Sequence, residues 1–441
     1  MKQIEQIQTQ STNLKLNTFF LTFICWIFVL QSTAIYAQTT VNEYYQAATK
    51  AYEDKDFETF LKSCQNMDSL RENHPTILYN LACAYSLNQK EAEAVQTLQQ
   101  LLLIDAKEQI RTEADFDNIR SSDGFKEVLA SLDSLQTPII YSDTAMIIPA
   151  KTLHPESIAF DAQTGDFYLS SFHLRKIVRV DKEGKVSDFI EEAQDGIWAV
   201  SGIKIDTSHR WLWVTTVAAP QMVHFEESED GQTGIFKYDL ESGKLLKKYV
   251  LKEEGPHWLG DLELDPNGTI YATDSKQPYI FCIKPESDSL EQYFTHPNFV
   301  SLQGITLDKS ASYLFVADYQ NGIFKINLTT QKIHPISPPK KVIFKGIDGL
   351  YFYDNSLISI QNGVNPMRVV RHYFEDNQFT FNHSQILDHH HPAFDEPTLG
   401  VMVGSNFFYI ANSPWAKYEK DGTMFSEDKL SDIVILKINL E

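Results

Sequence analysis

The residues with the clearest potential for chemistry occur at regular intervals after residue 155, each at the start of a short apolar segment. A glutamate, a glutamine and an aspartate stand among them, and the full set is Glu156, Ser201, Gly260, Gln303, Asp348 and Leu399. Carboxylate and amide oxygens are the ligands that hard divalent cations such as Ca²⁺ prefer. If the fold brings these positions together, the sequence predicts an oxygen-rich site for such a cation.

Each of these residues opens the same pattern: an apolar strand, a turn, and an aromatic-rich strand that ends in a polar residue. One copy reads Gln303-Gly-Ile-Thr-Leu-Asp308 followed by Leu314-Phe-Val-Ala-Asp318, and the copy that opens at Leu399 is the loosest. Successive copies start 45, 59, 43, 45 and 51 residues apart, within the range of propeller blades. Six four-stranded units closed in a ring predict a mainly β protein, a six-bladed β-propeller whose opening residues face one central funnel.

A second group of residues could contact a substrate at the mouth of this funnel. Two histidines precede opening residues, and the loops after the aromatic strands carry aromatic and carboxamide groups. A neutral imidazole can relay a proton, and the other groups suit a polar ring such as a sugar lactone. The predicted substrate-binding residues are His154, His257, Asp318, Asn362, Asn412 and Trp415. The alternative for each is a structural hydrogen bond to a nearby backbone group.

Residues 38–135 follow a helical period instead. Ala51-Tyr52 with Phe60-Leu61, and Ala84-Tyr85 with Ala94-Val95, recur at 33 to 34 residues. This small all-α domain resembles tetratricopeptide helix pairs, which bind a partner peptide or dock on a neighbouring domain. A packing appendage without a ligand is the alternative.

The pattern changes at Pro138, and the propeller is predicted over residues 138–441. Residues 139–148 are predicted to form a strand that closes the ring by joining the last blade, because this pairing would cover a free sheet edge.

The N-terminus and the composition narrow the setting. Residues 1–37 have the features of a signal peptide, with Lys15 before an apolar run over residues 19–30 and a cleavage site before Gln38. We expect an exported protein, periplasmic or extracellular, without an integral membrane domain after cleavage; an uncleaved anchor is the alternative. The remaining three cysteines lack CxxC spacing, so no zinc site is indicated. The net charge of −21 argues against nucleic acid as a partner.

Over residues 139–441 the chain resembles the gluconolactonase/regucalcin family, the senescence-marker and luciferin-regenerating group. The resemblance rests on Pro155-Glu156-Ser157, Gly260-Asp261-Leu262 with Asp265-Pro266-Asn267-Gly268, Gln303-Gly304-Ile305 and Asp348-Gly349-Leu350. It implies one divalent metal in the funnel, held by a Glu from the first blade, two Asn from middle blades and an Asp from a later blade. That Asp also serves as general base or nucleophile. Glu156 matches the Glu, and Asp348 matches the Asp.

The two Asn positions depart from the family's pattern. Gln303 stands at one and keeps an amide oxygen on a longer side chain, whereas Gly260 stands at the other and supplies no side-chain ligand. Asp261 could replace it if the strand start shifted by one residue, since such a shift moves side chains to the other face. The resemblance therefore implies Glu156, Gln303, Asp348 and Asp261 as metal ligands, Asp348 as the catalytic residue, and Ca²⁺ as the favoured ion.

These features favour an exported hydrolase for a small lactone or ester, in which a funnel cation polarises the carbonyl and Asp348 activates water. The alternative is a non-catalytic propeller that binds a ligand or a protein while the helices recruit a partner. Glu156 and Asp348 favour the enzyme, and the missing Asn pair favours the binding protein.

Overall fold

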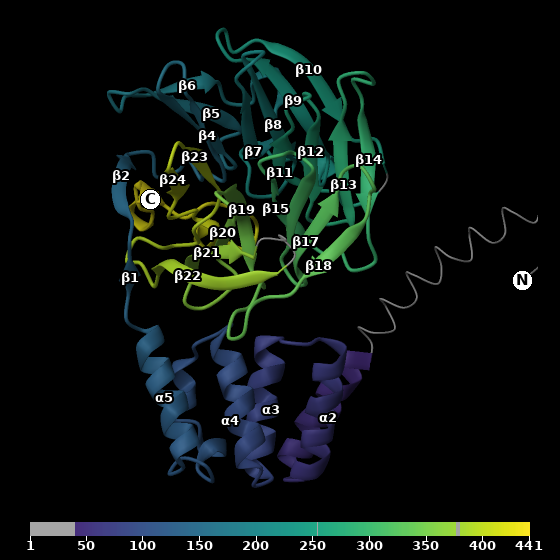
Figure 1. Cartoon of the computed structure of the whole chain (residues 1–441), viewed down its shortest axis with the longest axis vertical. Helices are drawn as coiled ribbons and strands as arrows, with labels where there is room; N and C mark the ends of the chain where they lie inside the picture. Colours follow the sequence, from purple (N-terminus) through teal and green to yellow (C-terminus); the bar gives the residue numbers. More distant parts are fainter. Residues whose placement is uncertain (1–39, 254, 376–379) are drawn as a thin grey trace, which may run out of the picture. The chain divides into compact units, whose positions relative to one another are not determined.

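A computed structural model describes residues 40–253, 255–375 and 380–441, which form two compact units (Figure 1). The first unit contains the described residues up to Leu101 together with Gln109–Val128, and the second contains Leu102–Glu108 with Leu129–Glu441. The predicted signal peptide lies outside the described residues. In the part of the chain that is described, no helix has both the length and the apolar character needed to cross a membrane.

The first unit is helical. A helix over residues 40–53 is followed by α2 (Phe57–Leu70), α3 (Pro75–Leu87) and α4 (Glu91–Leu102). Two 3₁₀ turns come next, η1 (Glu108–Arg111) and η2 (Ala114–Phe116). The last helix, α5 (Asp123–Leu135), begins in the first unit and ends in the second. Asp56 caps α2 by accepting a hydrogen bond from the backbone N–H of Thr59. Pro75 opens α3, where a missing N–H has no helical partner to lose. The tetratricopeptide interpretation of these helices stays a prediction.

The second unit is a six-bladed β-propeller, as predicted, and its described strands form six antiparallel sheets. In the first four blades the strands follow one another in the sheet in chain order, and the fifth and sixth blades each gain a strand from residues 139–148. The first strand of every blade begins within two residues of the repeated residue. The strands of the first three blades are β3 (Ile158–Asp161), β4 (Asp166–Ser171), β5 (Lys176–Val180), β6 (Val186–Ile190); β7 (Ala199–Asp206), β8 (Trp211–Val217), β9 (Thr233–Asp239), β10 (Leu245–Val250); and β11 (Leu259–Leu264), β12 (Ile270–Asp274), β13 (Tyr279–Ile283), β14 (Leu290–Thr295). Those of the last three are β15 (Leu302–Leu307), β16 (Tyr313–Asp318), β17 (Gly322–Asn327), β18 (Ile333–Ile336); β19 (Ile347–Tyr353), β20 (Ser356–Gln361), β21 (Arg368–Phe374), β22 (Phe381–His389); and β23 (Gly400–Val403), β24 (Asn406–Ile410), β25 (Ile433–Asn439).

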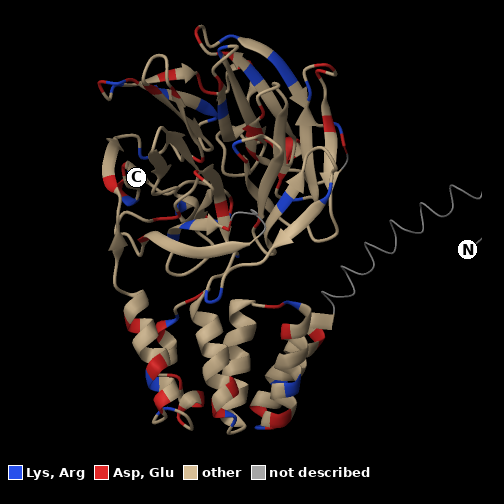
Figure 2. Cartoon of the chain, viewed as in Figure 1, with Lys and Arg blue, Asp and Glu red and all other residues tan. Residues whose placement is uncertain are grey.

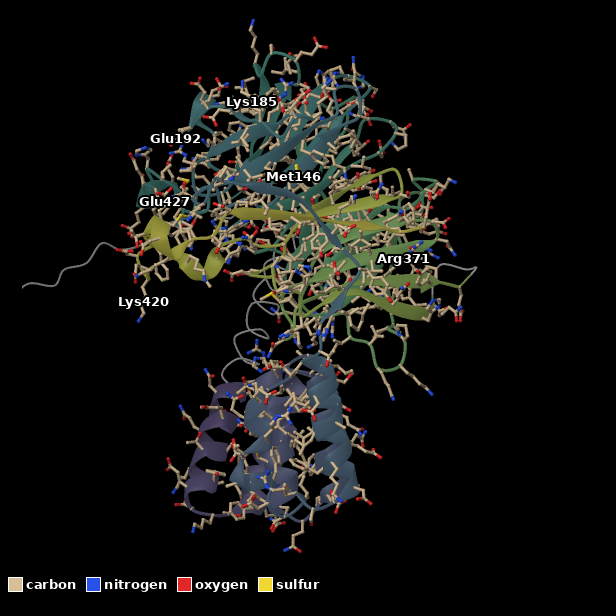
Figure 3. The ribbon with its side chains drawn as sticks, turned by 90° about the vertical axis from the view of Figure 1, so that its left-hand side faces the viewer. Met146, Lys185, Glu192, Arg371, Lys420 and Glu427 are labelled. Atoms are coloured by element: carbon tan, nitrogen blue, oxygen red, sulfur yellow. The ribbon has the colours of Figure 1, made fainter. Side chains whose placement is uncertain are left out.

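The last blade is completed by a strand that precedes the first. β2 (Asp143–Ile148) pairs antiparallel with β25, and Ile148 stands opposite Ile433; Met146 marks this strand in Figure 3. The predicted closure is therefore confirmed for residues 143–148. It is wrong for residues 139–140, which form β1 (Ile139–Ile140) and pair with β22 of the fifth blade instead. Residues 141–142, which belong to neither strand, separate the two short strands, so one continuous strand does not form.

Apolar side chains pack between neighbouring blades. In the described residues, six buried clusters each join two successive blades, and the series closes on itself around the ring. The cluster between the last and first blades contains Ile148, Ile158, Val178, Ile410 and Ile435. Because the clusters lie between the sheets, the inner strands are left to line a central channel.

In blades one to four, the aspartate that ends the first strand of the pattern caps the hairpin that follows. Asp161, Asp206, Asp265 and Asp308 each accept a hydrogen bond from the backbone N–H two residues later. Such an Asx turn fixes a tight connection between two strands. This hydrogen bond explains why the first strand of the pattern ends in aspartate in four of its copies.

Charged side chains of both signs are interspersed over the outer strands of the propeller (Figure 2). Several form ion pairs between neighbouring strands, including Lys176 with Asp188 at 2.9 Å and Arg179 with Asp166 at 2.7 Å. The outer acidic residues therefore solubilise the surface and do not mark a site.

Ring closure can be tested with two adjacent isoleucines of β2. Ile148 is 1% exposed in the cluster between the last and first blades, whereas Ile147 is 62% exposed. We expect Ile148→Ala to lower the free energy of unfolding of the propeller by about 2–5 kcal/mol, since it leaves a cavity. Ile147→Ala should change it by less than about 0.5 kcal/mol. Urea unfolding followed by tryptophan fluorescence measures both, and equal effects would contradict this closure.

Candidate active site

All six opening residues of the repeated pattern line one cavity at the centre of the propeller. Asp261, Phe172, Trp258 and Thr398 complete its wall. The cavity measures about 50 Å³, which is room for an ion with a few water molecules. A bound drug-sized ligand needs several hundred Å³, so only the reacting end of a larger substrate could enter.

Irregular pairing in the inner strands directs these residues to the channel. The register between the first two strands shifts at the opening residues of blades two to five, for example between Leu259 and Leu262. Such a bulge re-aims the side chains next to it. In blade three both Gly260 and Asp261 line the cavity, and the two carboxylate oxygens of Asp261 accept hydrogen bonds from the backbone N–H groups of Leu262 and Ile305.

The position after the opening residue is glycine in blades two, four, five and six, whereas blade one has Ser157 there. In blade two it is occupied by Gly202, where a Cβ atom would lie 2.6 Å from the carbonyl oxygen of Gly260 in the next blade. Only glycine allows the two backbones to approach so closely. Asp261 takes the equivalent place in blade three.

Hydroxyl groups on the second strands fix the opening residues of the following blades. Thr273 donates to the carbonyl oxygen of Gln303 at 2.8 Å, and Thr215 donates to that of Gly260. Ser170 does the same for Ser201 at 3.4 Å. The first three blades thereby each hold the backbone of the next blade, and this rigidity is what a preorganised site requires.

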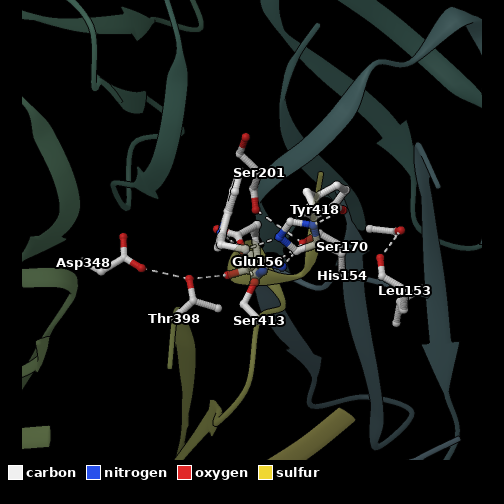
Figure 4. A network of polar contacts seen from close by, with 12 residues as sticks. Leu153, His154, Glu156, Ser170, Ser201, Asp348, Thr398, Ser413 and Tyr418 are labelled. Atoms are coloured by element: carbon white, nitrogen blue, oxygen red, sulfur yellow. Dashed lines mark hydrogen bonds and ion pairs between the residues drawn. The ribbon is translucent and has the colours of Figure 1, made fainter. Parts of the chain in front are cut away.

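Glu156 is held by residues from the last blade (Figure 4). Its Oε1 accepts hydrogen bonds from the Trp415 indole N–H at 2.8 Å and from the Ser413 hydroxyl. Nε2 of His154 lies 3.4 Å from the same oxygen, and Nδ1 of His154 lies 2.6 Å from the Tyr418 hydroxyl. Burial and the charge of Glu156 raise the pKa of Tyr418. Tyr418 therefore keeps its proton and can donate a hydrogen bond to Nδ1 of His154.

Asp348 is positioned by two donors on one oxygen. Its Oδ2 accepts from Asn362 Nδ2 at 2.8 Å and from Thr398 Oγ1 at 3.0 Å. Thr398 also contacts the backbone carbonyl of Glu156, so Figure 4 shows it between the two carboxylates. Tyr319 in turn donates to Asn362 Oδ1 at 3.0 Å, which orients the amide. This arrangement reserves Oδ1 of Asp348 for a reacting group or an ion.

Three carboxyl groups in and near the cavity have raised pKa values. Burial, and then the charge of Glu156, raise the pKa of Asp348 to about 7, although its surface toward the cavity stays accessible. Burial also raises the pKa of Asp261 to about 7, against the opposing effect of Lys204, and raises that of Glu396 to about 8. Negative charge in this environment is stabilised either by protons or by a cation.

Among the described residues, none of the six predicted substrate-binding residues lines the cavity, and three of them make structural contacts elsewhere. His257 pairs with Asp274 at 2.6 Å and is buried. Asp318 uses both oxygens for four backbone N–H groups, and Asn412 bridges the backbone of Asp432 and Val434. The reason is shared: the second strand of a blade ends at a loop whose backbone groups need partners, and a polar residue there supplies them. His154, Asn362 and Trp415, which were predicted to bind substrate, contact Glu156 or Asp348 directly, and their role in substrate binding stays a prediction.

Sequence reasoning missed most contributions from the last blade. Ser413 and Tyr418 contact Glu156 and His154, and Thr398 bonds Asp348. The copy of the pattern in this blade is the loosest, so its loops gave no repeat to align. Trp258 was missed because its neighbour His257 offered the more obvious chemistry.

The described residues of the cavity offer few charged ligands to a cation. Among the residues that the structure describes, no three His, Cys, Asp or Glu side chains are grouped closely enough to hold a metal ion. A cation here would need neutral oxygens as well, and Gln303 and Ser201 supply them. Ser201 is 7% exposed, and within the described residues its hydroxyl has no hydrogen-bond partner. A buried hydroxyl without a partner is costly, so this oxygen fits an ion or a substrate that enters the cavity.

No protein-family model matches the sequence, and a comparison with curated protein sequences gives no match. Among solved structures, the chain is similar to virginiamycin B lyase from Staphylococcus aureus, with 16% identity over 66% of this chain and 97% of that one and a TM-score of 0.44. It is also similar to a luciferin-regenerating enzyme, with 13% identity over 69% of this chain and 96% of that one and a TM-score of 0.46. A gluconolactonase from Xanthomonas campestris is similar as well, with 13% identity over 68% of this chain and 97% of that one and a TM-score of 0.43. Identities and TM-scores in this range transfer no function to this chain.

The raised pKa of Asp348 predicts a pH dependence of stability in the presence of a chelator. Between about pH 4 and 7 the unfolded chain loses this proton while the folded chain keeps it, so stability falls as the pH rises. The contribution is on the order of 4 kcal/mol for a shift from 3.8 to about 7. Asp348→Asn should flatten the fall, because an amide does not titrate.

Denaturant melts at several pH values measure this dependence, with Glu427→Gln, at an exposed position labelled in Figure 3, as control. A wild-type stability that does not fall between pH 4 and 7, or an unchanged slope in Asp348→Asn, would contradict the assignment.

Proposed function

We propose that this protein is an exported hydrolase of a small lactone or ester, with a divalent cation, Ca²⁺ as the favoured ion, in the propeller funnel. The proposal rests on the position and the raised pKa of the Asp348 carboxyl group. One of its oxygens is fixed by Asn362 and Thr398, and its pKa is raised to about 7 beside the carboxylate of Glu156. A carboxyl group with a pKa near the working pH is suited to general base catalysis.

The residues that would hold the cation are Glu156, Gln303, Asp348 and Asp261, joined by the unpartnered hydroxyl of Ser201. When bound, the cation would polarise the substrate carbonyl and offset the negative charge of the carboxylates. Oxygen ligands of this kind suit Ca²⁺, which accepts six to eight of them at variable geometry.

The protein's own residues supply the proton transfers. Asp348 accepts a proton from a water molecule whose oxygen attacks the carbonyl carbon, and it returns that proton to the alkoxide as the ester bond breaks. The products are a carboxylic acid and an alcohol, which a lactone yields as one hydroxy acid. Asn362 and Thr398 keep the carboxylate in place during both transfers.

Aromatic residues define the side of the cavity next to Glu156. The rings of Phe172 and Trp258 stack with centroids 5.5 Å apart, and Trp415 lies 4.8 Å from Phe172. Such a wall excludes water from the reacting end and offers a flat apolar surface to a ring substrate.

The setting and the partner belong to the same proposal. The basic residue, apolar run and small residues of the N-terminal segment favour export to the periplasm or the extracellular space. The tetratricopeptide-like spacing of the helices favours a docked protein partner.

The carboxylates give the central prediction. Asp348→Ala should abolish both hydrolysis of simple lactones and stabilisation by Ca²⁺, since it removes a ligand and the base together. Glu156→Gln keeps the shape of the side chain and should weaken the effect of Ca²⁺ more gently. Lactone hydrolysis assays and thermal melts with Ca²⁺ or a chelator measure the two effects.

Glu427→Gln, which removes an exposed carboxylate, serves as the control and should resemble wild type. A wild-type protein that neither hydrolyses lactones nor gains stability from Ca²⁺ would overturn the proposal. The non-catalytic binding propeller would then be the better account.

A further inference from the structure

A short segment from the helical half of the sequence belongs to the propeller unit. Leu102–Glu108 lies between α4 and η1 in the chain, yet it groups with the propeller. Its backbone forms hydrogen bonds with both the N–H and the carbonyl group of Asn365, a residue in the loop between β20 and β21. Asn365 donates its N–H to the carbonyl of Ile104 at 2.8 Å and accepts from Ala106 N–H at 2.8 Å. The Asn365 side chain also donates to Asp105 Oδ1 at 3.0 Å.

An arginine extends this contact along the loop. Arg368 donates to the carbonyl of Leu103 at 2.8 Å and to Gln361 Oε1 at 2.8 Å. Burial lowers the pKa of its guanidinium to about 10, and a buried charge depends on such partners. Gln361 in turn donates to the carbonyls of Ile343 and Lys345 at 2.9 and 2.8 Å, in the loop that leads into β19.

The same loop carries a residue of the candidate active site. Asn362 follows Gln361 directly and donates to Asp348. The backbone around it is tightly packed: Gly363 donates to the carbonyl of Gly346 at 3.1 Å, and a Cβ atom on Gly363 would lie 2.6 Å from Gly346 Cα. This loop packs closely against the backbone that leads into the strand of Asp348, so a displacement of the loop also displaces that strand.

We propose that Leu102–Glu108 is a positioning segment of the candidate active site. By holding Asn365 and Arg368 it fixes the loop of residues 361–368, and through Asn362 it fixes the carboxylate of Asp348. Its effect on catalysis rests on the proposed function, whereas its effect on the loop does not. The segment touches neither the substrate cavity nor the reacting atoms, so its role is positional.

The test uses the full chain with two substitutions, Asp105→Ala in the segment and Arg368→Met at the start of β21. Together they remove the side-chain hydrogen bonds from Asn365 to Asp105 and from Arg368 to Leu103. Hydrogen–deuterium exchange should quicken by about tenfold or more in residues 343–348 and 361–365, while the other blades stay unchanged. Arg368→Lys keeps the charge and one donor and should restore most of the protection. Asp117→Ala, which breaks an exposed pair with Arg120 in the first unit, is the matched control.

The activity of the same variants shows whether the segment positions Asp348 for catalysis or only stabilises the loop. We expect kcat for a lactone to fall by about tenfold, since a small misplacement of a catalytic group has an effect of this size, while KM stays within about twofold. Faster exchange confined to residues 102–108 overturns the proposal, and so does unchanged kcat in an active wild type. If wild type shows no hydrolysis, the proposed function fails, and the exchange at residues 343–348 alone decides the positioning role.

Should the double variant fail to fold, Asp105→Ala alone removes one exposed-side hydrogen bond and gives the same pattern at smaller amplitude. No quickening in residues 361–365 in that variant would also overturn the proposal.

Discussion

The candidate site depends on one electrostatic constraint: several carboxyl groups share a cavity from which bulk water is largely excluded. Glu156 and Asp348 line it, Asp261 forms part of its wall, and Glu396 adds a further negative charge nearby. Like charges in a poorly solvated space cannot all remain ionised without compensation. Burial raises the pKa of Asp261, and burial together with neighbouring carboxylates raises the pKa of Asp348 and of Glu396. A cation in the cavity is the compensation that we propose.

The propeller can impose this arrangement because its ring is closed and its blades are rigidly linked. β2 pairs with β25, so the first and last blades share a buried cluster that includes Ile148 and Ile158. Within the ring, each hydroxyl of the type represented by Thr273 fixes the opening residue of the next blade. The energy that brings the carboxylates together therefore comes from apolar packing between blades, which is distant from the chemistry.

The fold was predictable because its signals are local and repeated. The apolar strand, the aspartate that caps the hairpin and the aromatic strand recur in the sequence, and their spacing sets the number of blades. The convergence of Glu156 and Asp348 follows from that symmetry. The positions that break the repeat were not predictable: the bulge that turns Asp261 into the cavity and the last-blade loops with Ser413 and Tyr418 depend on tertiary contacts. Asp318 and Asn412 misled the analysis because a capping residue and a ligand-binding residue have the same chemistry.

The most direct measurement of the central claim is the metal content of the protein purified from its native compartment without chelator, together with that of Asp348→Asn. The account predicts close to one divalent ion per chain in wild type and its loss in the variant, with both proteins folded. A wild-type protein that carries no divalent ion, or a variant that retains it, would contradict the claim that these carboxylates are arranged around a cation.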